Sequence, residues 1–522
     1  MSDILLGHSF FLRFEPKLWP AKQPYPPLGT LYAAAYLRSH GYPVAFFDAM
    51  LADSESEWQA ALKIHQPRYA ILYEDNFNYL SKMCLLRVRQ AAFEMIRAAK
   101  DAGCTVIVGG SDATDHAQLY LQQGCDYVLI GEGEFTLVEL LDHLHKKTGT
   151  LLQDIPGLAF WRQKWTSSGP AGAEILHTPH RPDIKDLDAL PFPAWDLVDV
   201  SRYQEIWRDH HGYFSLNMVT TRGCPFHCNW CAKPIWGQRY NLRSPENVVA
   251  EMEYLHARFQ PDHIWFADDI FGLKPGWLPR FAELVQTHGV KIPYKCLNRA
   301  DLLLRAGEIE ALSRSGAQIV WIGAESGSQK VLDAMEKGTR VEQIYAATRQ
   351  LHQAGIQVGF FLQFGYPVET WGDIRQTIRM VRDCQPDDIG ISVSYPLPGT
   401  PFYERVRQGL GARRNWFTSD DLAMLYQGPF ATAFYRQLHT VVHKLHRVRK
   451  IWNSIKSVIF RPNGWNRLRI RQAARMLADV LSLPVEILRL HILKRRKNHL
   501  QMQIIGPALT QEQAAQPTPQ LE

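Results

Sequence analysis

The stretch TRGCPFHCNWCAKPIWGQRY, residues 221–240, places three cysteines within eight residues. Cys224, Cys228 and Cys231 follow the spacing C-x3-C-x2-C. Thiolates are the usual ligands of iron–sulfur clusters, and three of them can hold three irons of a 4Fe–4S cube while the fourth iron stays open. A small molecule can bind and react at an open metal position. The spacing therefore predicts a cluster that takes part in chemistry.

A zinc knuckle is the alternative interpretation of these cysteines. Structural zinc usually takes four closed ligands, commonly from two C-x2-4-C pairs. His227 could be a fourth ligand, but it lies inside the short loop, where it would strain the geometry. The other five cysteines are scattered: Cys84, Cys104, Cys125, Cys296 and Cys384. The ligand count favours the cluster.

The same motif, with the aromatic Trp230 just before the third cysteine, resembles the radical S-adenosylmethionine (SAM) superfamily. In that family the open iron chelates the amino and carboxylate groups of SAM. An electron from the cluster then cleaves SAM to methionine and a 5'-deoxyadenosyl radical. The resemblance implies that Cys224, Cys228 and Cys231 are both the metal ligands and the catalytic centre.

The bulk composition is that of a globular protein. A chain of 522 residues suggests several domains, and 46% hydrophobic with 21% charged residues is ordinary for a soluble chain. The first residues lack the basic and apolar parts of a signal peptide. No apolar run reaches the ~18 residues that a membrane span needs. The eight cysteines are few for a disulfide framework, so we expect a cytoplasmic protein.

Residues 1–148 alternate short apolar runs with helical patterns, starting with ILLGHSF at residue 4. Near-continuous apolar strands between helices predict a doubly wound, Rossmann-like parallel sheet, whose ligands bind beyond the carboxyl ends of the strands. Three loops at these ends resemble the cobalamin-binding domain of many radical SAM proteins: PPLG (26–29), GGSDAT (109–114) and GEGE (131–134). The resemblance implies cobalamin contacts from Gly109, Gly110, Ser111, Gly131 and Glu132.

One feature of many cobalamin domains is missing from these loops. The motif D-x-H-x-x-G, whose histidine ligates cobalt from below, does not follow the first strand. His8 lies there without the flanking Asp and Gly, and His116 follows a different strand. A ligand histidine normally needs an orienting partner, so we expect both to be core or surface residues and no histidine below the cobalt.

Residues 149–210 are interpreted as a linker that contains a small hairpin, with Trp195 and Trp207 as packing residues. Residues 211–410 contain six strand–helix units, which predict a partial (β/α)6 TIM-type barrel whose chemistry lies at the carboxyl ends of the strands. Polar side chains stand at these ends: Asp268, Asp269, Asn298, Arg299, Glu325 and Ser326. Ordinary caps or salt bridges could explain each of them singly, but not their common position.

The radical SAM resemblance implies a role for several of these residues. Glu325, in GAESGS with Ser326, corresponds to a contact with the SAM amino group or ribose, and Arg299 to a contact with the SAM carboxylate. Asp268 and Asp269 lie near the place where other members carry a glycine-rich segment touching the methionine moiety, but that segment is absent here. Residues 365–367 (GYP) are expected near the adenine.

Residues 411–505 are expected to be helical and basic, and residues 506–522, rich in Gln, Pro and Ala, to be disordered. Between Lys444 and Lys497 there are fifteen Lys and Arg against two acids. Three interpretations remain open: a solvated helical cap, contact with an anionic membrane surface, and a nucleic-acid surface, which is the least favoured.

Taken with the resemblance, these features predict a cobalamin-dependent radical SAM enzyme that methylates an unactivated carbon of a small-molecule or lipid-like substrate. An electron donor such as flavodoxin or ferredoxin is implied. A radical SAM cyclase without methyl transfer is the alternative, and a non-catalytic cobalamin sensor is a third possibility. Methylthiotransferases carry a second set of three cysteines upstream, which Cys84, Cys104 and Cys125 are too far apart to form.

Overall fold

Five parallel strands form the centre of the N-terminal third, in the order β2-β1-β3-β4-β5. The structure is a computed structural model that describes residues 2–166, 169–231, 235–455 and 467–495. The strands are β1 (Ile4–Gly7), β2 (Val44–Phe47), β3 (Tyr69–Tyr73), β4 (Thr105–Gly109) and β5 (Tyr127–Leu129). All five residues of β3 are buried, as a strand covered on both faces requires.

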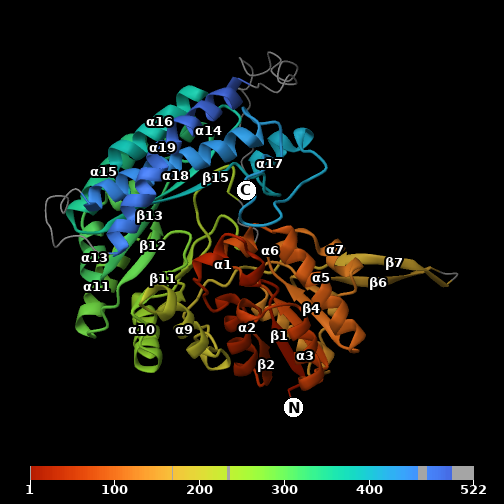
Figure 1. Cartoon of the computed structure of the whole chain (residues 1–522). Coiled ribbons are helices and arrows are strands. Elements are labelled where there is room, and N and C mark those ends of the chain that lie inside the picture. The colour runs from red at the N-terminus through yellow and green to blue at the C-terminus, as the bar shows by residue number, and fades with distance from the viewer. Residues whose placement is uncertain (1, 167–168, 232–234, 456–466, 496–522) are drawn as a thin grey trace, which may run out of the picture.

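Helices cover both faces of this sheet and create two separate apolar clusters. One cluster lies under α3 (Ser56–His65) and α5 (Leu86–Asp101), and the other under α2 (Leu28–Ser39) and α8 (Glu134–Leu144). Figure 1 shows this domain as the red and orange part of the molecule at the lower centre and right. The doubly wound Rossmann-like prediction is confirmed.

A long hairpin extends the same sheet beyond β5. Strands β6 (Leu158–Thr166) and β7 (Gly169–His177) pair with each other, and β6 pairs antiparallel with β5. The sequence predicts a hairpin within the linker, and the structure attaches it to the first sheet. Trp195 and Trp207, which follow it, are each 1% exposed and pack in the core as expected.

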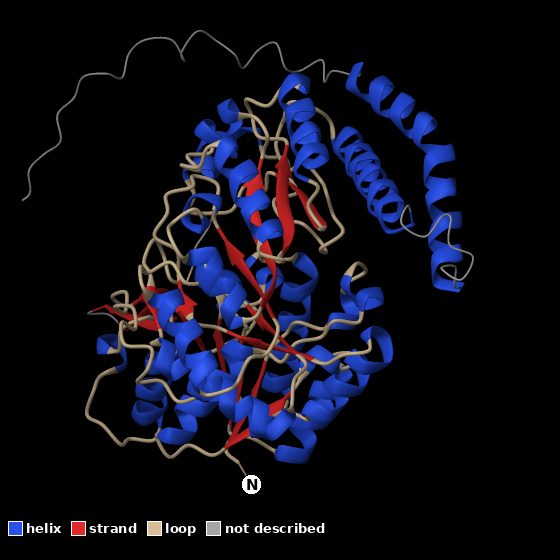
Figure 2. Cartoon of the chain, turned by 90° about the vertical axis from the view of Figure 1, so that its left-hand side faces the viewer, coloured by secondary structure: helices blue, strands red, loops and turns tan. Residues whose placement is uncertain are grey.

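The second sheet has six parallel strands in the order β15-β14-β13-β12-β11-β8. They are β8 (Ser215–Met218), β11 (His263–Phe266), β12 (Tyr294–Asn298), β13 (Ala317–Glu325), β14 (Gln357–Phe364) and β15 (Asp388–Val393). Among the described strands, β8 and β15 stand at opposite edges without pairing, so the sheet is a half-barrel. The predicted partial (β/α)6 barrel is confirmed (Figure 2).

Helices follow the strands of the half-barrel in the predicted alternation. They are α10 (Pro245–Phe259), α11 (Trp277–Thr287), α13 (Glu308–Ser315), α14 (Gln329–Ala334), α15 (Val341–Gln353) and α16 (Trp371–Cys384). Ser244 caps α10 by accepting a hydrogen bond from the N–H of Asn247 at 3.1 Å, and Pro245 occupies the first position, as the sequence predicts.

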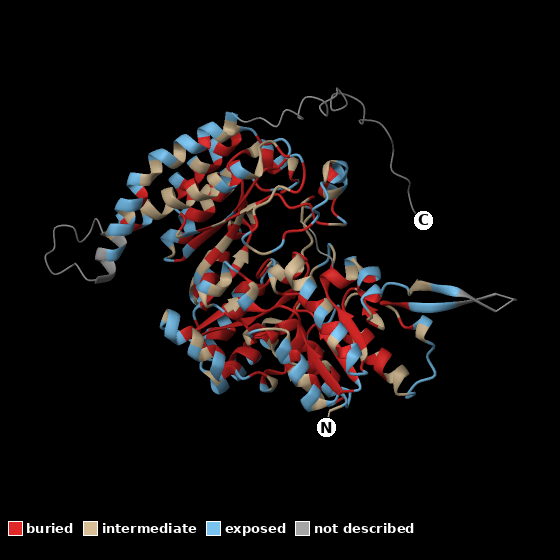
Figure 3. Ribbon diagram, turned by 45° about the vertical axis from the view of Figure 1, so that its right-hand side comes forward, coloured by how far each residue is buried: buried red, intermediate tan, exposed pale blue. Residues whose placement is uncertain are grey.

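Two long helices, α18 (Thr432–Ile455) and α19 (Arg467–Arg495), form an antiparallel pair in the C-terminal region. Lys444 bonds to Glu486 and Arg447 to Asp479, so partner numbers fall along α19 as they rise along α18. Figure 3 shows exposed residues along the outside of this pair. The predicted tail, 506–522, lies outside the described residues. In the described part of the chain, no helix is long and apolar enough to cross a membrane.

Candidate active site

The cysteine loop begins where β8 ends, after the short strand β9 (Thr221–Arg222). Gly223 has φ +83°, and a Cβ there would lie 2.4 Å from the carbonyl oxygen of Arg239, so only glycine fits the turn that leads to Cys224. The three loop cysteines are half-buried, whereas Cys84, Cys104, Cys125, Cys296 and Cys384 are buried. The structure thus separates three partly exposed thiols from five buried thiols, four of which pack in apolar clusters.

A single metal ion has no set of three His, Cys, Asp or Glu ligands among the described residues. A 4Fe–4S cluster takes each thiolate on a different iron, so its ligands need not converge on one point. Three accessible thiols on one loop, next to cationic side chains, form a donor set that fits such a cluster.

Arg299 is the first of these cations. Its guanidinium lies 4.0 Å from the Cys228 sulfur, donates to the Lys337 carbonyl at 2.8 Å and sits 3.7 Å from the centre of the Phe226 ring. The side chain is almost fully buried, at 4% residue exposure. The predicted carboxylate-binding arginine therefore stands beside the cysteine loop, and it also pairs with Asp301 at 3.0 Å.

Glu325 ends β13 at a register shift, with a left-handed backbone at φ +55°. Its carboxylate accepts a 2.8 Å hydrogen bond from the buried ammonium of Lys337. Burial lowers the pKa of Lys337, but the charges of Glu325 and Cys228 outweigh burial and raise the pKa above its usual value. Glu325 is thus paired inside the protein, and the Lys337 charge faces both Glu325 and the cysteine loop. The sequence analysis missed Lys337, which lies in a helix-to-helix turn.

Asp268 and Asp269 both follow β11, but their carboxylates bind different partners. The Asp268 carboxylate accepts four hydrogen bonds, of 2.7 to 3.0 Å, from the backbone and hydroxyl groups of Thr220 and Thr221. Burial raises the pKa of Asp268 to about 6 despite these donors. Asp269 pairs with Lys82 of the first domain at 2.9 Å. Asp268 therefore holds the base of the cysteine loop, and Asp269 joins the two domains. Neither carboxylate is left open toward a ligand in the way the sequence suggested.

Ser326 is fully buried and turned toward the helix layer. Its hydroxyl lies 3.1 Å from that of Thr377 and accepts from the N–H of Ser328. The Ser326 hydroxyl is therefore held by α16 in this structure, and its predicted contact with a cofactor stays a prediction. The loop at residues 365–367 does reach the cluster loop, since the Tyr366 hydroxyl donates to Asn229 Oδ1 at 2.8 Å.

The glycine loops of the first sheet lie at its carboxyl edge, as predicted, but protein groups occupy much of it. A Cβ on Gly110 would lie 2.6 Å from the Glu74 side chain. The N–H of Ser111 donates to Asn76 Oδ1 at 3.2 Å. Gly109 packs on Leu129, and a Cβ on Gly131 would meet His180 at 3.3 Å. The loop glycines are therefore needed for close packing of the edge itself.

Arg222, two residues before Cys224, crosses from the barrel to this edge. Its guanidinium bonds to Glu132 at 2.9 Å and to Glu134 at 2.7 Å, and all three side chains are at most 4% exposed. Burial raises the pKa of Glu132, while the Arg222 charge opposes that shift. Glu132, predicted to touch cobalamin, is thus tied to the loop that carries the cysteines. In the sequence, the signal for Arg222 was its place directly before Gly223 and Cys224.

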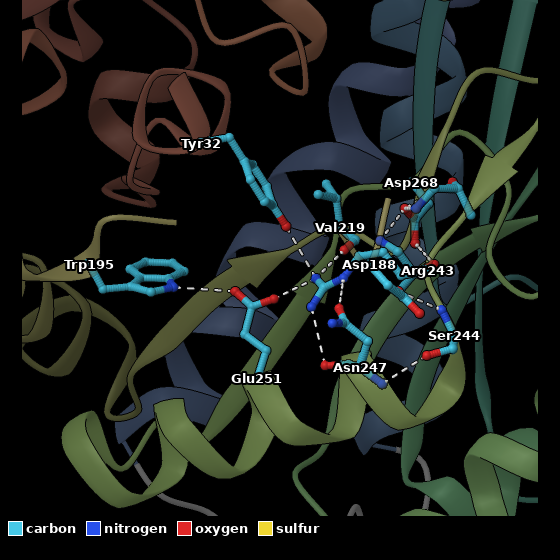
Figure 4. Close-up of polar contacts among 11 residues, drawn as sticks. Tyr32, Asp188, Trp195, Val219, Arg243, Ser244, Asn247, Glu251 and Asp268 are labelled. Carbon is cyan, nitrogen blue, oxygen red and sulfur yellow. Dashed lines mark hydrogen bonds and ion pairs between the residues drawn. The ribbon is translucent and has the colours of Figure 1, made fainter. Parts of the chain in front are cut away.

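A second buried arginine, Arg243, fixes the two domains further along the interface. It donates to Glu251 at 2.5 Å, to the Val219 carbonyl at 2.9 Å and to the Tyr32 hydroxyl of α2 at 3.2 Å. Glu251 also accepts from the Trp195 indole at 3.3 Å (Figure 4). The close-up shows how these groups converge from both domains and from the segment between them.

Cobalamin is a flat ring edged with amide groups, and its fit can be tested at the edge of the first sheet. Three buried side-chain oxygens there accept or donate no hydrogen bond among the described residues: Ser9 Oγ, Ser81 Oγ and Glu134 Oε2. Tyr79 is 56% exposed and lies close enough to Cys231 and Glu325 for their charges to act on its hydroxyl. These unpaired groups and the exposed ring facing the cysteine loop fit a polar-edged ligand between the domains.

The small void between Phe77, Trp236 and Arg222 holds only about 10 Å³ and is not the seat of a cofactor. His8 is fully buried, 3.5 Å from Asp48, and His116 pairs with Asp112 at 3.3 Å. Both histidines therefore belong to the protein core or its ion pairs, as the sequence analysis expected.

Comparisons with known proteins agree with this architecture. The radical SAM superfamily model matches residues 218–381, and the B12 binding domain model matches residues 20–141. An uncharacterised methyltransferase of Pyrococcus horikoshii is 25% identical over 433 residues, covering 79% of this chain and 88% of the relative. An anaerobic magnesium-protoporphyrin IX monomethyl ester cyclase of Synechocystis is 24% identical, covering 85% and 86%.

Among solved structures, the cobalamin-dependent S-adenosylmethionine radical enzyme OxsB with aqua-cobalamin bound has a TM-score of 0.66. It is 17% identical and covers 94% of this chain and 76% of its own, so the likeness concerns the fold. The chain therefore combines a radical SAM domain with a B12 binding domain, and the cofactors of these two domains are a 4Fe–4S cluster, SAM and cobalamin.

Proposed function

We propose that the protein is a methyltransferase that acts on an unactivated carbon of a small-molecule or lipid-like substrate. The observation that carries the proposal is Arg222, because the loop with the cluster cysteines is tied through this residue to the carboxyl edge of the B12-binding domain. When bound, the cluster and SAM supply a hydrogen-abstracting radical, and cobalamin supplies a methyl group.

The chain's own residues orient these groups. Cys224, Cys228 and Cys231 would hold the cluster, and Asp268 holds the start of their loop. Arg299 and Lys337 place two positive charges beside Cys228, where the carboxylate of SAM would be neutralised. Glu325, already close to one cation, would face the SAM amino group. Gly110, Ser111 and Gly131 would lie against the corrin with Tyr79 nearby.

The test is anaerobic reconstitution with iron, sulfide, cobalamin, a reductant and SAM bearing a deuterated methyl group. The reaction is run with host extract, and products are analysed by mass spectrometry. We expect a product that gains a labelled methyl group. A chain that binds no cobalamin, or from which the label never reaches a product, would refute the proposal.

A cyclase is the second candidate, favoured by the relative from Synechocystis. The same experiment separates the two, because a cyclase changes the mass of its substrate without taking up the label. A methyltransferase gains three deuterium atoms.

We propose that a small electron carrier such as flavodoxin or ferredoxin reduces the cluster. The chemical reductant can be replaced by either carrier with its reductase in the same assay. Formation of 5'-deoxyadenosine with one of them supports this partner, and its absence with both, while dithionite works, refutes it.

We also propose that α19 lies on an anionic membrane surface. Six large apolar residues form an exposed row on this helix: Leu477, Val480, Leu481, Val485, Leu488 and Ile492. The two acids of the helix, Asp479 and Glu486, are turned inward onto Arg447 and Lys444. The outer face therefore keeps its apolar row and exposed arginines at both ends, which suits an interface with acidic lipids.

Vesicles provide the test. The full chain should sediment with phosphatidylglycerol-containing vesicles and much less with pure phosphatidylcholine. The double variant Leu481→Glu/Leu488→Glu should lose this binding, and Ile64→Glu, equally exposed on α3, should keep it. Equal binding of the parent chain and both variants, or binding of RNA in place of vesicles, would contradict a membrane-facing α19.

A further inference from the structure

The concave face of the half-barrel carries side chains that its strands leave partly uncovered. Along β14, Phe360, Leu362 and Phe364 are at most 1% exposed, but Phe361 between them is 40% exposed. Trp265, Lys295 and Trp321, on β11, β12 and β13, are also half-buried and point to the same side as Phe361. Because side chains alternate along a strand, these four residues share the face opposite the helices.

Two of these rings lie flat on the sheet, and glycines make room for them. A Cβ on Gly359 would lie only 2.3 Å from the Trp321 indole. Phe361 stacks on Trp321 with 4.7 Å between ring centres, and a Cβ on Gly390 would lie 3.3 Å from the Phe361 ring. The result is an aromatic platform, Trp321 and Phe361, with its outer side uncovered.

Lys295 stands beside the platform without a carboxylate partner. Its ammonium lies 4.5 Å from the ring centre of Trp265 and 5.3 Å from that of Tyr25. Among the described residues no acid lies within ion-pair distance of it, although the more distant charge of Asp388 partly offsets burial, which lowers the pKa of Lys295 to about 8. A desolvated ammonium held by aromatic rings gains most from an anion that can approach it.

The platform and the lysine are well placed relative to the cysteine loop. Lys295 precedes Asn298 at the strand end by three residues, which is about 10 Å along a strand. Phe361 pairs in register with Gly323, two residues before Glu325. A ligand that touches both Lys295 and Phe361 would therefore extend toward the strand ends that face the cluster loop.

We propose that this concave face binds the substrate, and that the substrate has an apolar or aromatic body and an anionic group. The body lies on Trp321 and Phe361, and the anion, a carboxylate or phosphate, pairs with Lys295. Binding sites of this kind combine apolar walls with few, well-placed polar groups. The inference rests on the proposed function, since it names the substrate class of the same enzyme.

Two fluorescent probes test this site without any cofactor. 1-Anilinonaphthalene-8-sulfonate carries an anion on an aromatic body, and N-phenyl-1-naphthylamine is its neutral counterpart. Both are titrated into the full chain carrying Leu481→Glu/Leu488→Glu, which removes the exposed row of α19 as a competing site. We expect the anionic probe to bind about tenfold more tightly than the neutral one, as one charge-assisted hydrogen bond provides.

Variants then locate the two parts of the site. Lys295→Met should abolish the preference for the anionic probe and leave the neutral probe unchanged, and Lys295→Arg should restore the preference. Phe361→Ala should weaken both probes. Circular dichroism checks that each variant is folded.

Equal binding of the two probes by the chain with Lys295 intact would overturn the anion site. Tighter binding of the anionic probe that persists in Lys295→Met would overturn it as well. Unchanged binding in Phe361→Ala would overturn the platform. Probe binding needs neither cluster nor SAM, so failure of methyl transfer with intact binding would refute the proposed function alone.

Discussion

The carboxyl edge of the first sheet and the mouth of the half-barrel hold their buried charges in different ways. The carboxyl edge of the first sheet is acidic, with Glu74, Glu132 and Glu134 buried at its strand ends. The mouth of the half-barrel places the cations Arg299 and Lys337 beside the cysteines. Arg222 crosses between them and neutralises the acidic edge with a barrel residue. The difference shows that the buried acids of the B12-binding edge take their cation from the neighbouring domain, whereas Glu325 of the barrel mouth takes its cation, Lys337, from the barrel itself.

The largest expected effect lies at the barrel mouth. Cys228→Ala removes one of three cluster ligands, so we expect iron content to fall and 5'-deoxyadenosine formation to drop below detection. Iron analysis and chromatography of the anaerobic reaction measure both. Cys296→Ala, a buried cysteine of β12, is the control and should keep both properties. An unchanged adenosine yield in Cys228→Ala would rule out the proposed cluster site.

We expect the contact of Arg222 with the first sheet to contribute more to the free energy of unfolding than any of the exposed ion pairs. Arg222→Met leaves Glu132 and Glu134 buried without their cation, which should cost about 3–5 kcal/mol of unfolding free energy. Guanidinium unfolding followed by fluorescence measures the loss. The same substitution at the exposed Arg38–Asp196 pair should cost less than about 1 kcal/mol. If the two variants were equally stable, Arg222 would not be the link we describe.

The barrel side of the comparison also contains a buried acid, Glu369, that forms no ion pair among the described residues. Its carboxylate accepts a hydrogen bond from the Gly365 N–H at 2.7 Å, and burial raises its pKa from 4.5 to about 8. The folded chain therefore binds more protons than the unfolded chain between these values, so stability should fall as pH rises through this window. The free energy of unfolding should decrease by about 1.4 kcal/mol for each pH unit inside the window.

Unfolding midpoints at pH 5.5, 7 and 8.5 measure this effect. Glu369→Gln, which resembles the protonated acid, should flatten the decline. Glu342→Gln, at an exposed position of α15, should leave it as in the parent chain. The same slope in all three proteins would show that Glu369 ionises normally.

The smallest expected effects distinguish the role of Asp268 from that of its neighbour Asp269. Asp268→Asn turns one acceptor oxygen into a donor against Thr220 or Thr221, which should cost about 1–3 kcal/mol and lower the iron content. Asp269→Asn only weakens the more exposed pair with Lys82 and should cost less than about 1 kcal/mol. Equal losses of iron would mean that Asp268 does not hold the cysteine loop.

Much of the fold could be predicted from the sequence because its signals are local. Apolar strands, helix caps such as Ser244 and the spacing of Cys224, Cys228 and Cys231 depend on residues close in the chain. The polar residues at the strand ends were also found, since parallel strands bring their ends to one edge. Their partners were not, because Asp268 meets Thr220, and Ser326 meets Thr377, across about fifty residues.

The sequence by itself determined the cluster loop, the two parallel sheets and the order of the domains, since spacing and periodicity are properties of neighbouring residues. Only the tertiary structure decided which buried charged side chains bind partners within the protein and which remain able to bind a ligand. Glu132 is paired with Arg222 and Asp268 with two threonines, whereas Lys295 contacts aromatic rings and forms no ion pair within the described part of the chain. The physical reason is that a buried charge takes its properties from partners that only folding brings within reach.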